Sequence, residues 1–128
     1  MVLLEHTPLT GVAHFDWMLE RPGVDEGPLV TFRLDQRPDH CPLGRRLSSH
    51  RIGDHRRAYL DYEGPLSGNR GSVRRVASGI VWSLEETPTL MLLTLQWESG
   101  DHARWLAKAA TPVAGTALEK PWEWLRET

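Results

Sequence analysis

Glycine and proline recur so often along this chain that they leave little room for long helices. The 128 residues include 11 glycines and 9 prolines, which divide the sequence into segments of about 8 to 20 residues. Short segments bounded by turn-forming residues favour β-strands over helices. The spacing therefore predicts a mainly β protein, and a chain of this length fits a single domain.

Alternation of side-chain character predicts where the strands lie. Within residues 14–20, Phe15, Trp17 and Leu19 share one face, and the side chains between them point to the other. Both the pattern and the turn signals predict further strands at residues 1–6, 29–34, 57–62, 73–77, 80–84 and 89–97. The last of these is the most apolar and is expected to be buried on both faces.

One segment departs from the strand pattern. Residues 102–110 are predicted to form a helix that ends at Thr111-Pro112, and residues 121–124 a strand or a docked tail. The tryptophans are expected to pack in the core rather than to form base-stacking platforms or an exposed cluster; they are Trp17, Trp82, Trp97, Trp105, Trp122 and Trp124. About seven strands with one or two helices imply a β-rich barrel or sandwich.

The sequence has no feature of a secreted or membrane protein. Its longest apolar run, residues 90–95, is far shorter than the roughly 20 residues that a membrane helix needs. The first residues contain neither a basic stretch nor a signal cleavage site. A lone cysteine, Cys41, excludes an internal disulfide and a cysteine-rich zinc site. We therefore expect a cytoplasmic protein without a membrane partner.

Arginine is concentrated in one segment, although the formal net charge of the chain is only −2. Residues 45–75 contain eight arginines and no lysine against three acidic residues, a net charge of +5, which leaves −7 for the rest. The planar guanidinium suits bidentate contacts with phosphate or carboxylate. The segment indicates either a site for a phosphate-bearing partner or a solvated, salt-bridged surface.

His14 and Asp16 form the most informative pair of polar residues. Side chains two positions apart on a strand point to the same face, so this imidazole and carboxylate would lie side by side. Such mixed ligands suit a divalent transition metal such as Mn²⁺ or Zn²⁺, and His6 on the preceding strand is the candidate third ligand. The spacing also fits a polar strand face on which His14 hydrogen-bonds Asp16.

A second group lies inside the arginine-rich segment. Asp54 and His55 precede Tyr59 and a glycine-rich turn at residues 63–71. Backbone N–H groups of such a turn can bind phosphate, with His55 as donor or general acid and Tyr59 as a hydrogen-bond donor. The alternative is that Tyr59 packs in the core and His55 caps a turn.

Both groups resemble the 3′-phosphoesterase domain of bacterial DNA ligase D. That family's His-aromatic-Asp-aromatic-Arg-Leu-Glu strand is matched by residues 14–20 (His-Phe-Asp-Trp-Met-Leu-Glu), and its Val-x-x-Trp-Asp-x-Gly strand and turn resemble residues 73–79. Positions between them match in order: Asp54, His55, Tyr59, Tyr62, Glu63, Gly64, Leu66, Gly68 and Gly71. The resemblance covers residues 6–82.

The resemblance implies a small, mostly antiparallel β-barrel with one or two short flanking helices, formed by residues 1–128 as one domain. It also implies a Mn²⁺-dependent hydrolase, with Zn²⁺ as the alternative ion, that removes 3′-phosphates or 3′-ribonucleotides from DNA ends in repair. By this resemblance His6, His14 and Asp16 bind the metal, and His55 and Tyr59 are catalytic and hold the phosphate. Further phosphate contacts would come from Arg51, Arg56 and Arg70.

Three features depart from the family. Met18 stands where the family has a phosphate-binding arginine, His6 lies two residues farther from His14 than usual, and no Arg-Asp motif precedes His6. Candidates to replace the arginine in space are Arg33, Arg51, Arg56 and Arg70.

These departures leave two alternative functions: a nucleic-acid-end binding module without catalysis, and a small-molecule phosphate hydrolase or binder. The expected partners are DNA 3′ ends or a nucleotide phosphate, with a ligase or polymerase in trans.

Overall fold

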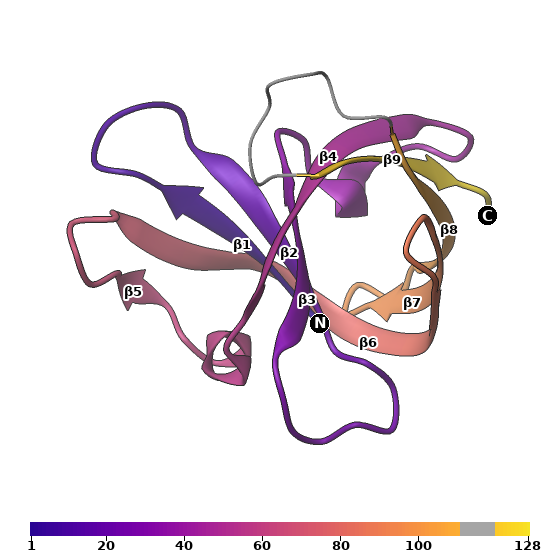
Figure 1. The fold of residues 1–128 in the computed structure, drawn as a ribbon, viewed down its shortest axis with the longest axis horizontal. Helices are drawn as coiled ribbons and strands as arrows, with labels where there is room; N and C mark the ends of the chain where they lie inside the picture. The colour runs from indigo at the N-terminus through magenta and orange to yellow at the C-terminus, as the bar shows by residue number, and fades with distance from the viewer. Residues whose placement is uncertain (111–119) are drawn as a thin grey trace.

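The computed structural model describes residues 1–110 and 120–128, which form an antiparallel β-barrel (Figure 1). These residues contain two 3₁₀ helices, η1 (Pro38–His40) and η2 (Arg57–Leu60), and no α-helix. They also contain nine strands: β1 (Val2–Thr7), β2 (His14–Leu19), β3 (Leu29–Leu34), β4 (Arg46–His55), β5 (Gly64–Pro65), β6 (Ser72–Glu86), β7 (Leu90–Trp97), β8 (His102–Ala109) and β9 (Lys120–Arg126). The prediction of a mainly β, mostly antiparallel barrel is confirmed.

The flanking helices that were expected are the two 3₁₀ turns η1 and η2. In the part of the chain that the structure describes, no helix is long and apolar enough to cross a membrane. The expected helix stop at Thr111-Pro112 lies outside the described residues.

Eight strands close the barrel in the order β1-β2-β3-β4-β9-β8-β7-β6, and β6 pairs back onto β1. Every pairing is antiparallel, and β5 adds two residues to the free edge at the start of β6. Figure 1 shows β4, β9, β8, β7 and the end of β6 curving around the ring, while β1, β2, β5 and the start of β6 extend together to one side. The candidate site lies on this extended side.

Strand β6 closes the barrel because it pairs with two different strands along its length. Its first half, through Ser78, pairs with β1, and its second half, from Gly79, pairs with β7. A Cβ at Gly79 would lie 2.2 Å from the carbonyl oxygen of Gln96, so the close approach of the strands requires glycine. The sequence predicted two strands that meet at residues 78–79; the structure joins them into one bent strand.

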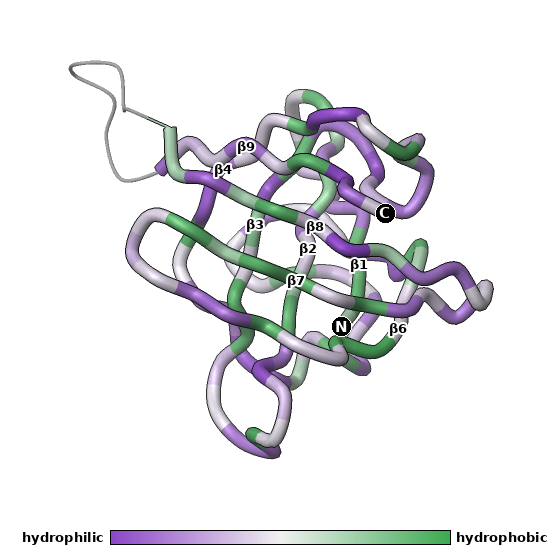
Figure 2. Tube along the Cα trace, turned by 90° about the vertical axis from the view of Figure 1, so that its right-hand side faces the viewer, coloured by the Kyte–Doolittle hydropathy of each residue, from purple (hydrophilic) through white to green (hydrophobic). Residues whose placement is uncertain are grey.

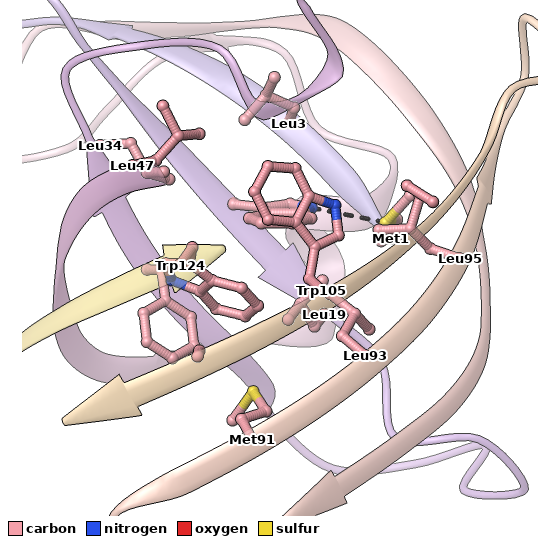
Figure 3. Close-up of a cluster of buried hydrophobic side chains, with 14 of the residues drawn as sticks. Met1, Leu3, Leu19, Leu34, Leu47, Met91, Leu93, Leu95, Trp105 and Trp124 are labelled. Carbon is pink, nitrogen blue, oxygen red and sulfur yellow. Dashed lines mark hydrogen bonds between the residues drawn. The ribbon is translucent and has the colours of Figure 1, made fainter. Parts of the chain in front are cut away.

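The interior of the barrel is packed with aromatic rings. Trp17, Trp105 and Trp124 are completely buried, and the ring of Trp17 lies 5.0 Å from that of Trp124 between centroids. Figure 3 shows Trp105 and Trp124 among aliphatic side chains from other strands, such as Leu19 and Leu93. Core packing of these tryptophans agrees with the sequence prediction. Trp82 is the exception, because it is 54% exposed on β6.

A second apolar cluster covers the opposite, outward face of β1, β2 and β3. Its buried members are Val2, Leu4, Met18, Leu29 and Val73. Residues of η2 and the following turn, Tyr59, Leu60 and Leu66, pack over it. The chain from η2 to β5 is therefore held against the outside of the barrel, beside the histidines of β1 and β2.

The prediction of a helix at residues 102–110 is wrong, because residues 102–109 form β8. Alanine, leucine, lysine and arginine favour a helix locally, but burial here has the two-residue period of a strand. Ala103, Trp105 and Ala107 are buried, and His102, Arg104 and Lys108 on the other face are exposed. Pairing with β7 and β9 on either side fixes the extended conformation.

Other elements also differ from their predictions. Residues 57–60 form the helix η2 rather than part of a strand. Of the two alternatives for residues 121–124, a strand or a docked tail, the strand is confirmed and extends over residues 120–126 as β9. Strand β7 is not buried on both faces, since Met91 is buried and Leu92 is only partly so, and this alternation continues along it. Figure 2 shows the mostly apolar character of β7.

Candidate metal centre and adjoining cavity

His6, His14 and Asp16 meet on the outward face of β1 and β2. The antiparallel register places His6 directly opposite His14 and Leu4 opposite Asp16. Since Asp16 lies two residues after His14, both point to the same side of the sheet as His6. The six residues 8–13 that connect the strands absorb the unusual spacing between the histidines, so this departure from the family pattern does not separate them.

The three side chains form a cluster that could hold a metal ion, because their potential ligand atoms all lie within 4.8 Å of one another. His6 Nδ1 lies 3.1 Å from His14 Nε2 and 3.7 Å from an oxygen of Asp16, and His14 Nε2 lies 3.5 Å from the other oxygen. Metal–ligand bonds of about 2.0–2.2 Å put neighbouring ligand atoms roughly 3.0–3.5 Å apart. The separations therefore fit one ion, and two imidazoles with a carboxylate suit a divalent transition metal.

A backbone carbonyl orients His6 for this role. Nε2 of His6 lies 2.7 Å from the carbonyl oxygen of Arg70, which can only accept, so Nε2 carries the proton. In neutral His6 the lone pair is then on Nδ1, the atom that faces His14 and Asp16. Hydrogen bonds of this kind fix the tautomer of metal-binding histidines.

Asp16 is the buried member of the cluster, with 3% of its surface exposed. Burial acts to raise the pKa of Asp16, but the hydrogen bond from His14 and the positive charges of His14, Arg33 and His55 outweigh it and hold this pKa below its usual range. Arg33 is paired with Asp16 across β2 and β3, and its Nε lies 3.4 Å from the carboxylate. The carboxylate is therefore available as an anionic ligand.

His55 and Tyr59 follow each other at the end of β4 and in η2, and their ring centroids lie 5.7 Å apart. His55 Nδ1 lies 2.8 Å from the carbonyl oxygen of Gly53, so it donates there, and no described residue forms a hydrogen bond with its Nε2. Tyr59 packs over the outer apolar cluster that contains Met18. Met18 is 1% exposed, so the position of the family arginine is here part of a small core.

A cavity of about 320 Å³ lies next to this group. Its walls combine cationic, hydroxyl and apolar side chains: Arg56, Ala58, Tyr59, Tyr62, Pro65, Leu66, Ser67 and Arg70. Arg70 connects the cavity to the metal cluster, because it lines the cavity and its carbonyl oxygen accepts a hydrogen bond from His6 of the cluster. The structure therefore brings Tyr59, Arg56 and Arg70 together.

Arg51, in contrast, lies on the opposite face of the sheet. Its guanidinium lies over the rings of Phe32 and Trp122, at 5.8 and 6.0 Å from their centroids, and 3.5 Å from Glu86. Ser49, two residues earlier, is buried on the same inner face. Arg51 is thus directed away from the metal cluster, and Arg33 takes its place beside it. The sequence offered Arg33 only as one of four candidates. Its alternation with the apolar Phe32 and Leu34 on β3 is the signal for its outward position.

Ion pairing distinguishes the remaining arginines of residues 45–75. A carboxylate oxygen lies within 4.0 Å of each of Arg46, Arg51, Arg57, Arg74 and Arg75. Among the residues that the structure describes, no such partner lies near Arg45, Arg56 or Arg70. Two of these three line the cavity. The basic segment is thus largely a salt-bridged surface, with free cationic capacity where the cavity adjoins the metal cluster.

The chain matches no model of a known protein family, and no curated protein resembles it in sequence at a significant level. The geometry of the cluster and cavity is therefore the basis for any function assigned to it.

Proposed function

We propose that this protein is a metal-dependent phosphoesterase that acts on the 3′ ends of DNA in end repair, with Mn²⁺ as the preferred ion. The observation that carries the proposal is the junction at Arg70, where a cluster of metal-binding character adjoins a cavity lined by two arginines that have no carboxylate partner among the described residues. A metal site alone would fit many functions. A metal site beside guanidinium groups suits a phosphate monoester or diester.

Each group has a distinct part in the proposed reaction. A divalent ion held by His6, His14 and Asp16 would act as a Lewis acid that draws charge from a phosphoryl oxygen. Arg56 and Arg70 would bind the phosphate and balance the charge that develops on it. Further supporting residues would be His55, whose free Nε2 is suited to protonate the leaving oxygen, and Tyr59, which would donate a hydrogen bond.

The test is release of phosphate from a DNA primer that ends in a 3′-phosphate. We expect turnover with Mn²⁺, none after treatment with EDTA, and none from the same primer carrying only a 5′-phosphate. His14→Ala and His55→Ala should each lower turnover at least 100-fold, a magnitude typical of lost acid–base or electrostatic groups. His102→Ala, which removes an exposed histidine of β8, is the matched control. Full activity of both site variants would refute the assignment.

A nucleic-acid-end binding module is the second candidate, and the burial of Met18 favours it. The family arginine is absent, and nothing charged can occupy that position without entering an apolar cluster. This candidate predicts salt-dependent retention of the primer without any product in Mn²⁺. A small-molecule phosphatase would instead release phosphate equally well from a free nucleotide and from the primer.

A further inference from the structure

The cavity beside the metal cluster has more apolar and aromatic surface than a phosphate alone would need. Tyr59 and Tyr62 lie with their rings 6.1 Å apart and 84° from parallel, so one presents a face where the other presents an edge. Ala58, Pro65 and Leu66 complete the apolar part of the wall. A volume of about 320 Å³ is at the small end of the range for organic ligands.

The polar part of the wall is cationic. Arg56 and Arg70 both line the cavity, and among the described residues neither has a carboxylate within ion-pairing distance. Ser67 adds a hydroxyl group. The cavity therefore combines an aromatic and apolar wall with two guanidinium groups, which matches a ligand that has a flat ring at one end and an anion at the other.

The cavity is formed before any ligand arrives. Tyr62 donates a hydrogen bond from its hydroxyl group to the carbonyl oxygen of Pro65, and Arg70 Nε donates to the carbonyl oxygen of Ser67 at 2.8 Å. Gly71 anchors the far end of the turn, at a φ of +86° and so close to β1 that a Cβ would lie 2.0 Å from the carbonyl oxygen of Thr7. A braced wall of this kind loses little conformational freedom on binding.

We propose that this cavity is a nucleoside pocket, which binds a base against Tyr62 while Arg56 and Arg70 hold the phosphate attached to the same sugar. The proposal rests on the proposed function, since it assigns the terminal nucleotide of the substrate to a place beside the metal cluster. The ligand class is a nucleoside phosphate, whether free or at the end of a strand. Tyr62 is 39% exposed, so its ring is open to a stacking partner.

Binding to metal-free protein tests the pocket separately from catalysis. In EDTA, thymidine 3′-phosphate should bind at least tenfold more tightly than inorganic phosphate, as measured by calorimetry. Tyr62→Ala should remove this advantage and leave phosphate affinity within twofold, and Arg56→Gln should weaken both ligands. Trp82→Ala, which removes an exposed ring on β6 away from the cavity, is the control and should change neither. An oligonucleotide with a 3′-phosphate, compared with the free nucleotide, identifies which source is preferred.

The inference is overturned if thymidine 3′-phosphate binds no more tightly than phosphate, or if Tyr62→Ala and Trp82→Ala have equal effects. Should Tyr62→Ala fail to fold, the Arg56→Gln result decides, because Arg56 is exposed and an unchanged affinity for both ligands would equally overturn the proposal. These outcomes differ from failure of the proposed function, in which nucleotide binding persists while the primer is not hydrolysed in Mn²⁺.

Discussion

On strand β2, Trp17 and Leu19 face the barrel interior, whereas His14 and Asp16 face outward between β1 and β3. The inner side chains are completely buried among other apolar groups. The outer ones are charged or titratable and contact His6 and Arg33. Because adjacent residues of one strand point to these two faces, substitutions only one position apart can alter stability and chemistry separately.

The largest effect is expected on the inner face. Trp17→Ala would leave a cavity among the rings of Trp97, Trp105 and Trp124, all of which contact Trp17. Losses for such truncations are about 3–5 kcal/mol. Urea unfolding followed by tryptophan fluorescence and circular dichroism would measure the loss. A loss under about 1 kcal/mol would show that the barrel interior does not hold the fold together as described.

The outward face of β2 carries an apolar residue as well as the polar ones, because Met18 lies on that face yet belongs to an apolar cluster. Substitution of Met18 tests whether this position contributes to stability or to chemistry. Met18→Arg restores the arginine of the resembled family but places a charge at a position that is 1% exposed. We expect it to lower stability by about 2–4 kcal/mol and not to increase phosphate release. Met18→Leu, the size-matched control, should cost less than about 1.5 kcal/mol. A stable and more active Met18→Arg would contradict the assignment of this position to a core.

His14→Ala should separate metal affinity from unfolding stability most clearly. Removing one ligand is expected to weaken Mn²⁺ binding at least tenfold, or about 1.4 kcal/mol, while unfolding stability changes by less than about 1 kcal/mol. Electron paramagnetic resonance of free Mn²⁺ measures the first quantity, and urea unfolding the second. His102→Ala should leave both unchanged. Equal Mn²⁺ affinity in the two variants would show that His14 does not bind the ion.

The smallest effect concerns charges that support the fold away from the cluster. The hydrogen bond from Arg21, together with the charges of Arg21 and Arg51, outweighs burial and lowers the pKa of Glu86. A lowered pKa in the folded state means that Glu86 stabilises the protein above the unfolded-state pKa, about 4.3, and that this contribution is lost as pH falls through the folded value.

Glu86→Gln should therefore cost up to about 1 kcal/mol at pH 7 and have no effect in strong acid, where the stabilities of variant and parent converge. Urea unfolding over a pH series measures this, with Glu85→Gln, on the same strand and without an ion pair among the described residues, as the control. Mn²⁺ affinity at pH 7 should not change. A constant difference at every pH would mean that the Glu86 ion pairs do not contribute.

The outward cluster could be predicted because two of its members lie on one strand. The two-residue period of β-structure places His14 beside Asp16 without any knowledge of the rest of the fold. His6 was the candidate third ligand because it lies on the strand before His14, and the register of β1 against β2 places it directly opposite His14. The choice among arginines was not made from the sequence, because the position of Arg33 beside Asp16 and that of Arg51 beside Phe32 depend on how β3 pairs with β2 and β4.

Strand β8 shows why local preference was insufficient for the fold. Residues 102–110 are composed mainly of good helix formers, and no glycine or proline interrupts them. Their extended conformation results from hydrogen bonds to β7 and β9 and from the burial of Trp105 between them. Such neighbours are set by the whole topology, which a local pattern does not contain.

Closure of the ring by β6 has a consequence for when the cluster can form. The pairing of β1 with β6 joins His6 to Val73, and the Arg70 carbonyl that orients His6 lies just before the same strand. Contacts between residues so far apart in sequence are slow to form, and barrels rich in them fold in milliseconds to seconds. His6 gains its full set of neighbours only when the first and last strands of the ring meet. If the cluster binds a metal ion, uptake of that ion during refolding would therefore follow the kinetics of that junction and would report when the barrel is complete.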